Sequence, residues 1–193
     1  MKCAGSRKRR VCESGVNRWI AREGGLVNGI ILYRSSSGST KQYAEWIHEE
    51  TGFPVHDTRE KNASWKGADP VVIGCPVIAN KPFLKGWIAN NWNDLKGKNV
   101  ALFTTSGADP ATEPVLGWVE NAFPEAIRSG IQFFPLPGRF DYAKLRGMNK
   151  AMIWGAGVLL GNKDVKNQMK NPVDGVAKER LSDLLYYLRS LSG

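Results

Sequence analysis

Hydrophobic positions along the chain alternate between short continuous runs and longer stretches with helical spacing. The short runs have the length of strands buried on both faces. They predict strands over 30–33, 53–57, 71–74, 99–104 and 131–136. Apolar residues that recur every three or four positions predict helices over 40–50, 83–95, 112–123 and 176–191. Strands interleaved with helices predict an α/β domain with a parallel sheet and helices on both faces.

The loops that follow the predicted strands are the places to look for a ligand. In an open parallel sheet, ligands bind outside the carboxyl ends of the strands, at the point where the strand order reverses. Three segments meet this condition, namely 34–40, 74–80 and 104–110.

The first of these segments reads RSSSGST, from Arg34 to Thr40, and leads into a predicted helix. A helix N-terminus offers unpaired N–H groups and a partial positive charge, and the hydroxyls and Gly38 add donors without bulk. The pattern lacks the GxxxxGK[ST] and GxGxxG motifs, so a phosphate monoester such as that of FMN is favoured over ATP or NAD. The alternative is an ordinary serine-rich loop that caps a helix.

The order Ile31-Leu32-Tyr33-x-Ser35-x-x-Gly38-x-Thr40, followed by Ala44 and Ile47, resembles the flavodoxin signature. This resemblance implies a doubly wound, flavodoxin-like five-stranded parallel sheet of order 2-1-3-4-5 that binds FMN non-covalently. It also implies which residues contact the FMN phosphate, namely Ser35, Ser36, Ser37, Gly38, Ser39 and Thr40.

Two further stretches extend the resemblance. Residues 69–88 are similar to the third strand and flavin loop of flavodoxin-domain proteins, and residues 138–153 resemble the menaquinone-dependent protoporphyrinogen oxidase branch. By analogy, the second and third loops would hold the isoalloxazine ring. The implied contacts are Cys75, Pro76, Val77, Ile78, Ala79, Thr105, Ser106, Gly107, Ala108 and Asp109.

The chain departs from an electron-carrier flavodoxin in two respects. Neither ring loop contains an aromatic residue, so stacking would come from elsewhere, with Phe140, Tyr142 and Trp118 as candidates. The C-terminal part is basic, whereas carriers are acidic around the flavin. Both departures favour a flavin open to a substrate or quinone. Three hypotheses stay open: an FMN electron carrier, a quinone-linked flavoenzyme similar to protoporphyrinogen dehydrogenases, and a flavin-free binding module.

The net charge of +9 is concentrated at the two ends. Residues 1–26 carry seven Lys or Arg against two Asp or Glu, residues 27–138 carry ten against eleven, and residues 139–193 carry ten against five. We predict a basic, disordered extension over 1–26 and an FMN-binding domain over 27–193. A translation start near Val27 would be an alternative explanation of the first 26 residues. The expected partners are a redox protein or a quinone, with peripheral contact to an anionic membrane, and no nucleic acid.

The remaining features indicate a cytoplasmic protein. No run of 18 apolar residues exists, and no apolar stretch of signal-peptide length follows the basic N-terminus. The weakly polar segment 151–161 is too short to cross a bilayer. It either packs on the sheet edge or lies in a membrane interface or against a partner. Three cysteines at irregular spacing indicate a reducing compartment, with Cys75 as a small buried residue rather than a redox thiol. His48 and His56 predict neither a catalytic triad nor a metal site.

Overall fold

The computed structural model describes residues 28–60, 64–78, 80–108, 110–111, 113–140, 142 and 172–191. The predicted extension over 1–26 lies outside the described residues, and so does all of segment 138–161 beyond Phe140 except Tyr142.

The centre of the molecule is a parallel sheet of five strands. The strands are β1 (Ile30–Tyr33), β2 (Val55–Asp57), β3 (Val71–Ile78), β5 (Val100–Ser106) and β6 (Ile131–Pro137). Their order is β2-β1-β3-β5-β6, and every pairing along this path is parallel. Counting only these five strands, the order is 2-1-3-4-5, so the predicted fold class is confirmed.

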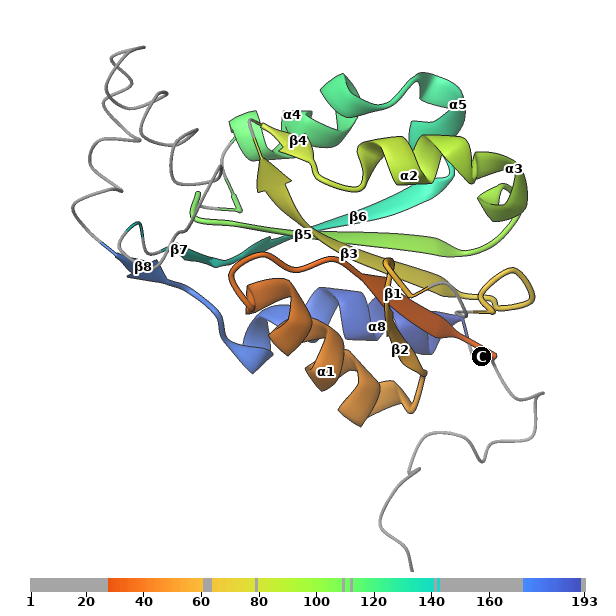
Figure 1. Cartoon of the computed structure of the whole chain (residues 1–193), viewed down its shortest axis with the longest axis horizontal. Coiled ribbons are helices and arrows are strands. Elements are labelled where there is room, and N and C mark those ends of the chain that lie inside the picture. Colours follow the sequence, from red (N-terminus) through yellow and green to blue (C-terminus); the bar gives the residue numbers. More distant parts are fainter. Residues whose placement is uncertain are drawn as a thin grey trace, which may run out of the picture.

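Helices cover both faces of the sheet (Figure 1). On one face lie α1 (Ser39–Thr51) and α8 (Ser182–Ser190), the latter preceded by the 3-10 turn η3 (Lys178–Leu181). On the other face lie α2 (Lys85–Asn90), α3 (Trp92–Leu95), α4 (Glu113–Ala122) and α5 (Glu125–Arg128).

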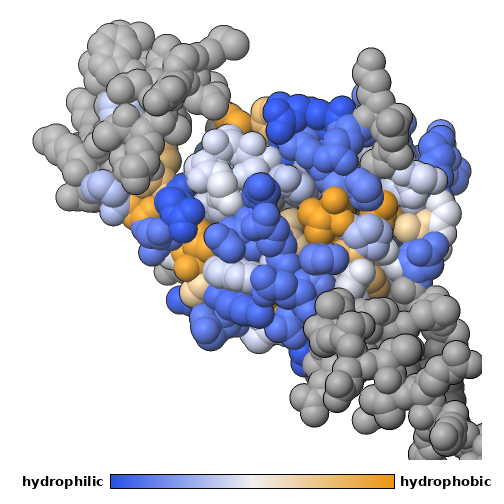
Figure 2. Space-filling model, turned by 60° about the horizontal axis from the view of Figure 1, so that its bottom comes forward, coloured by the Kyte–Doolittle hydropathy of each residue, from blue (hydrophilic) through white to orange (hydrophobic). Residues whose placement is uncertain are grey.

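Two hydrophobic clusters hold these layers together. Because successive strand residues point to opposite faces, Leu32 and Ile73 face the α2 side whereas Ile31 and Val72 face the α1 side. All four side chains are buried, which explains why the strands read as continuous apolar runs rather than alternating ones. The side of the molecule that comes forward in Figure 2 shows hydrophobic areas separated by hydrophilic residues.

The third strand is longer than predicted. The sequence-based strand ends at Gly74, but β3 continues to Ile78 and turns back into β4 (Lys81–Pro82). The predicted loop 74–80 is therefore mostly a β-hairpin. Pro76 does not end the strand, because its carbonyl accepts a hydrogen bond from the N–H of Phe83 at 2.9 Å and its missing N–H needs no partner.

Two predicted helices are divided. The pattern over 83–95 becomes α2 and α3, separated at Asn91, whose side-chain amide donates to the carbonyl of Trp87 at 2.8 Å. A side chain that bonds to nearby backbone in this way competes with the helical ladder. The pattern over 176–191 begins as η3 and becomes α-helical only at Ser182.

A two-stranded antiparallel ribbon follows β6. It consists of β7 (Arg139–Phe140) and β8 (Val173–Asp174) and lies at the side toward which the carboxyl ends of the sheet point (Figure 1). Within the described residues, no helix combines the length and the apolar character needed to cross a bilayer.

Candidate functional site

The serine-rich loop lies where the sequence predicts it, between β1 and α1. Ser36, Ser37 and Gly38 are exposed, whereas Ser39 and Thr40 are buried at the start of the helix. Gly38 has a φ of 89° and precedes the first helical residue. This left-handed conformation favours glycine, and an added Cβ there would meet nothing within 4 Å, so the space above the loop is open.

The loop presents unpaired backbone donors. Among the described residues, the N–H of Gly38 bonds to the Ser35 hydroxyl at 3.1 Å, but the N–H groups of Ser36, Ser37, Ser39 and Thr40 have no hydrogen-bond partner. The first turn of α1 contains no acidic residue. The arrangement therefore combines free N–H donors, exposed hydroxyls and the positive end of a helix dipole, as anion-binding helix termini do.

Two buried hydroxyls tie this loop to the rest of the sheet edge. The Thr40 hydroxyl lies 2.8 Å from the Thr105 hydroxyl, and the Ser39 hydroxyl accepts a hydrogen bond from the N–H of Arg139 at 2.9 Å. Residues 35–40 and the end of β5 are thus brought together. The Thr40–Thr105 contact joins residues 65 positions apart, which no local pattern could have indicated.

The β3–β4 hairpin carries the FMN contacts that were predicted for the second loop. Pro76, Val77 and Ile78 are strand residues on it, and Ala79 at its tip lies outside the described residues. Cys75 is fully buried in the core, and burial raises the pKa of its thiol to about 12. Its side chain therefore faces away from solvent, as expected for a small buried residue, and only its backbone is available to a ligand.

The end of β5 carries the FMN contacts that were predicted for the third loop. Thr105 and Ser106 belong to the strand, Gly107 and Ala108 follow it, and Asp109 lies outside the described residues. The Ser106 hydroxyl accepts from the N–H of Ala108 at 3.3 Å, which closes a tight turn.

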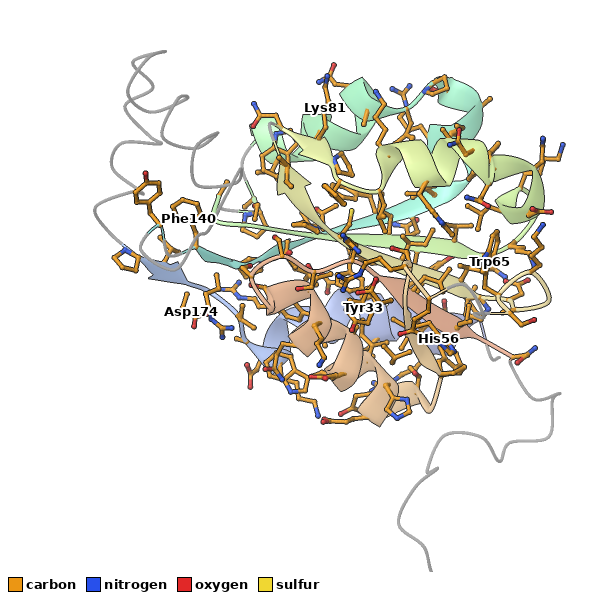
Figure 3. All side chains as sticks on the ribbon, viewed as in Figure 1. Tyr33, His56, Trp65, Lys81, Phe140 and Asp174 are labelled. Carbon is orange, nitrogen blue, oxygen red and sulfur yellow. The ribbon has the colours of Figure 1, made fainter. Side chains whose placement is uncertain are left out.

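The three aromatic residues named as stacking candidates lie in different surroundings. Phe140 lies at the carboxyl end of the sheet, opposite the end that carries Trp65 (Figure 3). A Cβ on Gly107 would approach the Phe140 side chain to 3.2 Å, so Phe140 borders the β5 turn. Trp118 is buried in α4 and offers no exposed ring face. Tyr142 is half-buried.

The sequence did not predict that Phe83 would be an exposed aromatic residue near the carboxyl edge of the sheet. It directly follows β4, and its side chain is 48% exposed. The Arg34 guanidinium lies 5.9 Å from the centre of the Phe83 ring, which places Phe83 beside the start of the serine loop. The sequence pattern placed Phe83 at the start of a predicted helix over 83–95, and no signal marked it as exposed.

An ion-pair cluster lies at the ends of β1 and β2. Arg59 donates to both carboxylate oxygens of Asp57, at 2.9 and 2.6 Å, and Arg34 contributes a longer contact of 3.5 Å. The hydrogen bonds from Arg59 hold the pKa of Asp57 at about 2, below its ordinary 3.8, against the opposing effect of burial. The carboxylate is therefore ionised throughout the physiological pH range.

The lowered pKa of Asp57 predicts a loss of stability in acid. Because the folded state binds this proton less readily than the unfolded state, the contribution is present above about pH 4 and is lost as the pH falls toward 2. We expect it to reach about 1 to 2 kcal/mol after screening by solvent. Urea denaturation of the wild type and of Asp57→Asn at several pH values measures it. An Asp57→Asn variant with the same slope between pH 4 and 2 would assign the effect to other groups.

Each of the two histidines makes a polar contact with a residue close to it in the sequence. His48 Nδ1 is 2.7 Å from the carbonyl of Phe53, and His56 Nδ1 is 3.0 Å from Glu60 Oε2. Within the described ranges, no group of three or more His, Cys, Asp and Glu could hold a metal ion.

Comparisons with known proteins bear on this arrangement. A family model described as Flavodoxin domain matches residues 30–164. No curated protein matches the chain. Similar solved structures include an FMN complex of a flavoprotein from Lactobacillus acidophilus NCFM, at 18% identity over 58% of this chain and 93% of that chain, with a TM-score of 0.43.

Two other similar structures have comparable scores. A flavodoxin from the domain Archaea is 18% identical over 74% of this chain and 99% of that chain, with a TM-score of 0.38. A flavoprotein from Bacteroides uniformis is 17% identical over 60% of this chain and 90% of that chain, with a TM-score of 0.37.

Proposed function

Because the chain belongs to the flavodoxin domain family, we propose that it binds FMN non-covalently and takes part in electron transfer. The observation that carries the proposal is the loop after β1, where four N–H groups without a partner in the described structure lie at the start of a helix with no acidic residue in its first turn. Bound FMN would supply the transfer of electrons, and the protein supplies binding, orientation and electrostatics.

The residues of the loop fit a phosphate monoester. Ser35, Ser36, Ser37, Gly38, Ser39 and Thr40 would hold it. The exposed N–H groups of Ser36 and Ser37 are free to donate, and the open space at Gly38 lets a ligand approach the backbone. The buried hydroxyls of Ser39 and Thr40 serve a different role, because their contacts to Arg139 and Thr105 fix the loop against the sheet.

The ring of the cofactor would lie between the β3–β4 hairpin and the β5 turn. Pro76, Val77, Ile78, Thr105, Ser106, Gly107 and Ala108 would contact it, with Cys75 through its backbone, and with Ala79 and Asp109 as further contacts. The small side chains of the β5 turn allow the backbone to approach a planar ring. Phe140 and Phe83 border the two sides of this region.

Titration of the flavin-free full-length chain with FMN tests the proposal. We expect saturable binding that quenches flavin fluorescence, and much weaker binding of riboflavin, which lacks the phosphate. Absence of binding by FMN would refute the proposal and favour a flavin-free binding module on the same scaffold.

A quinone-linked flavoenzyme is a second candidate within the proposed function. The described residues of the β5 turn contain no aromatic side chain of their own, and Phe140 borders the turn only at its edge. A ring that is covered only at its edge would be open to a quinone. Such an enzyme would be a cytoplasmic protein that contacts the inner face of the membrane. A soluble electron carrier would instead meet a redox protein at this edge.

Stopped-flow mixing separates the two candidates. The FMN-loaded protein is reduced with dithionite and mixed with a menaquinone analogue or with an oxidised ferredoxin. Rapid transfer of two electrons and two protons to the quinone, giving quinol and oxidised protein, supports the enzyme. Rapid single-electron exchange with the ferredoxin, without quinone reduction, supports the carrier.

A further inference from the structure

Arg34 has a fixed position beside the predicted flavin site. Its backbone N–H donates to the carbonyl of Gly74 at 2.9 Å, which anchors it between β1 and β3. Its guanidinium lies between the Asp57 carboxylate, at 3.5 Å, and the ring of Phe83, whose centre is 5.9 Å away. The side chain is only 27% exposed.

The charge of Arg34 is incompletely compensated. Arg59 takes up both oxygens of Asp57 at hydrogen-bond distance, so the contact from Arg34 Nη1 is the longer one. Within the described structure, Nη1 is buried and has no hydrogen-bond acceptor. A guanidinium stays protonated at every relevant pH. A buried cationic donor without an acceptor is costly unless a ligand supplies one.

The contacts of Arg34 place its charge toward the β3–β4 hairpin, where the flavin ring is proposed to lie. The hydroxyls of Ser39 and Thr40 contact β7 and β5. The Arg34 guanidinium instead contacts the end of β2 and Phe83, which follows the β3–β4 hairpin. The hairpin carries the residues Cys75–Ile78 that are proposed to hold the ring.

We propose that Arg34 is a tuning residue, whose guanidinium, held between Asp57 and Phe83, favours reduced over oxidised FMN. This inference rests on the proposed function. Reduction adds electron density to the ring, and a nearby fixed cation stabilises that density more than it stabilises the oxidised ring. Phe83 covers one side of the guanidinium, which limits screening by water and strengthens the interaction. The chain would then have a higher potential than one with a neutral residue at this position.

Comparison of Arg34→Gln with Arg59→Gln tests the inference. Both variants lose one cation from the same cluster, but Arg59 is 68% exposed and does not contact Phe83. We expect Arg34→Gln to weaken the binding of reduced FMN, relative to oxidised FMN, by about tenfold or more. This equals a fall of about 30 mV in the two-electron potential. Arg59→Gln should change that ratio by clearly less. Spectroelectrochemical titration measures the potential, and fluorescence titration measures the affinity for oxidised FMN.

Two further variants guard against a purely structural effect. Arg34→Lys keeps the charge and should retain most of the wild-type potential. Asp57→Asn removes the carboxylate that partly compensates Arg34 and should shift the potential in the opposite direction. An Arg34→Gln variant that binds both redox states equally less well, with an unchanged potential, would overturn the inference and assign Arg34 to the phosphate. Failure of the wild type to bind FMN would instead refute the proposed function, and the inference with it.

Discussion

Replacing Phe103 with Ala is expected to lower the free energy of unfolding by about 3 to 5 kcal/mol, the range for losing a buried aromatic ring. Phe103 lies on the central strand β5 and is 0% exposed. Its ring packs edge-on against Tyr43 of α1, with the ring centres 6.4 Å apart. The ring also fills the space beside Gly74 of β3, so its removal leaves a cavity bordered by two strands and a helix.

The same contact makes Gly74 intolerant of a side chain. A Cβ at this position would lie 2.2 Å from the Phe103 ring, so Gly74→Ala would overpack the core. The double variant Gly74→Ala/Phe103→Leu should be more stable than the sum of the single changes indicates, because the smaller side chain makes room. Urea denaturation followed by circular dichroism measures Phe103→Ala, the double variant and its two single variants, Gly74→Ala and Phe103→Leu, with the exposed Tyr186→Ala as a control expected within about 0.5 kcal/mol of the wild type. Additive effects would show that Phe103 and Gly74 are independent.

Replacing Ser36 with Asp is expected to weaken FMN binding strongly without destabilising the fold. Ser36 is exposed in the loop before α1, and its side chain has no hydrogen bond within the described structure. A carboxylate there would repel a bound phosphate by about 1 to 4 kcal/mol per pair of unit charges, depending on the local dielectric. This corresponds to a loss of about fivefold to nearly a thousandfold in affinity. The same carboxylate would interact favourably with the N-terminus of α1, so stability should stay equal or rise slightly.

Weaker FMN binding together with equal or higher stability would separate repulsion of the phosphate from damage to the fold. The Ser36→Asn variant has nearly the same side-chain shape as Ser36→Asp but no charge, so it should keep most of the affinity for FMN. Fluorescence titration with FMN and thermal unfolding without FMN give the two quantities. An Asp variant that binds FMN as tightly as the wild type would place the phosphate away from this loop.

Most of the candidate site could be predicted because its components are local in sequence. A strand that ends at Tyr33, followed by a glycine and a helix start within 34–40, determines the free N–H groups, and no distant residue is needed to recognise them. The ring side was predicted less well. The sequence pattern ends β3 at Gly74, because a glycine followed by a cysteine and a proline reads as a loop, whereas β5 pairs with the strand as far as Pro76 and β4 pairs with its last residues.

Phe83 and Arg34 illustrate the same limit. Phe83 fits the apolar spacing of a helix over 83–95, but β4 places it before α2 and leaves it exposed. Arg34 is a polar residue in a polar loop until β2 places Asp57 beside it. The exposure of Phe83 depends on the β3–β4 hairpin, and the position of Arg34 depends on Asp57, 23 positions along the chain, so the apolar spacing contains neither of them.

Local patterns in the sequence are sufficient to predict the five strands, the main helices, the burial of the central strands on both faces, and the serine loop with its glycine. These follow from hydrophobic periodicity and from backbone conformation, which act over a few residues. Only the tertiary structure shows that Thr40 bonds to Thr105, that Phe83 is exposed, and that Arg34 contacts both Asp57 and Phe83. These contacts come from the pairing of distant strands, and their geometry exists only once the sheet has formed.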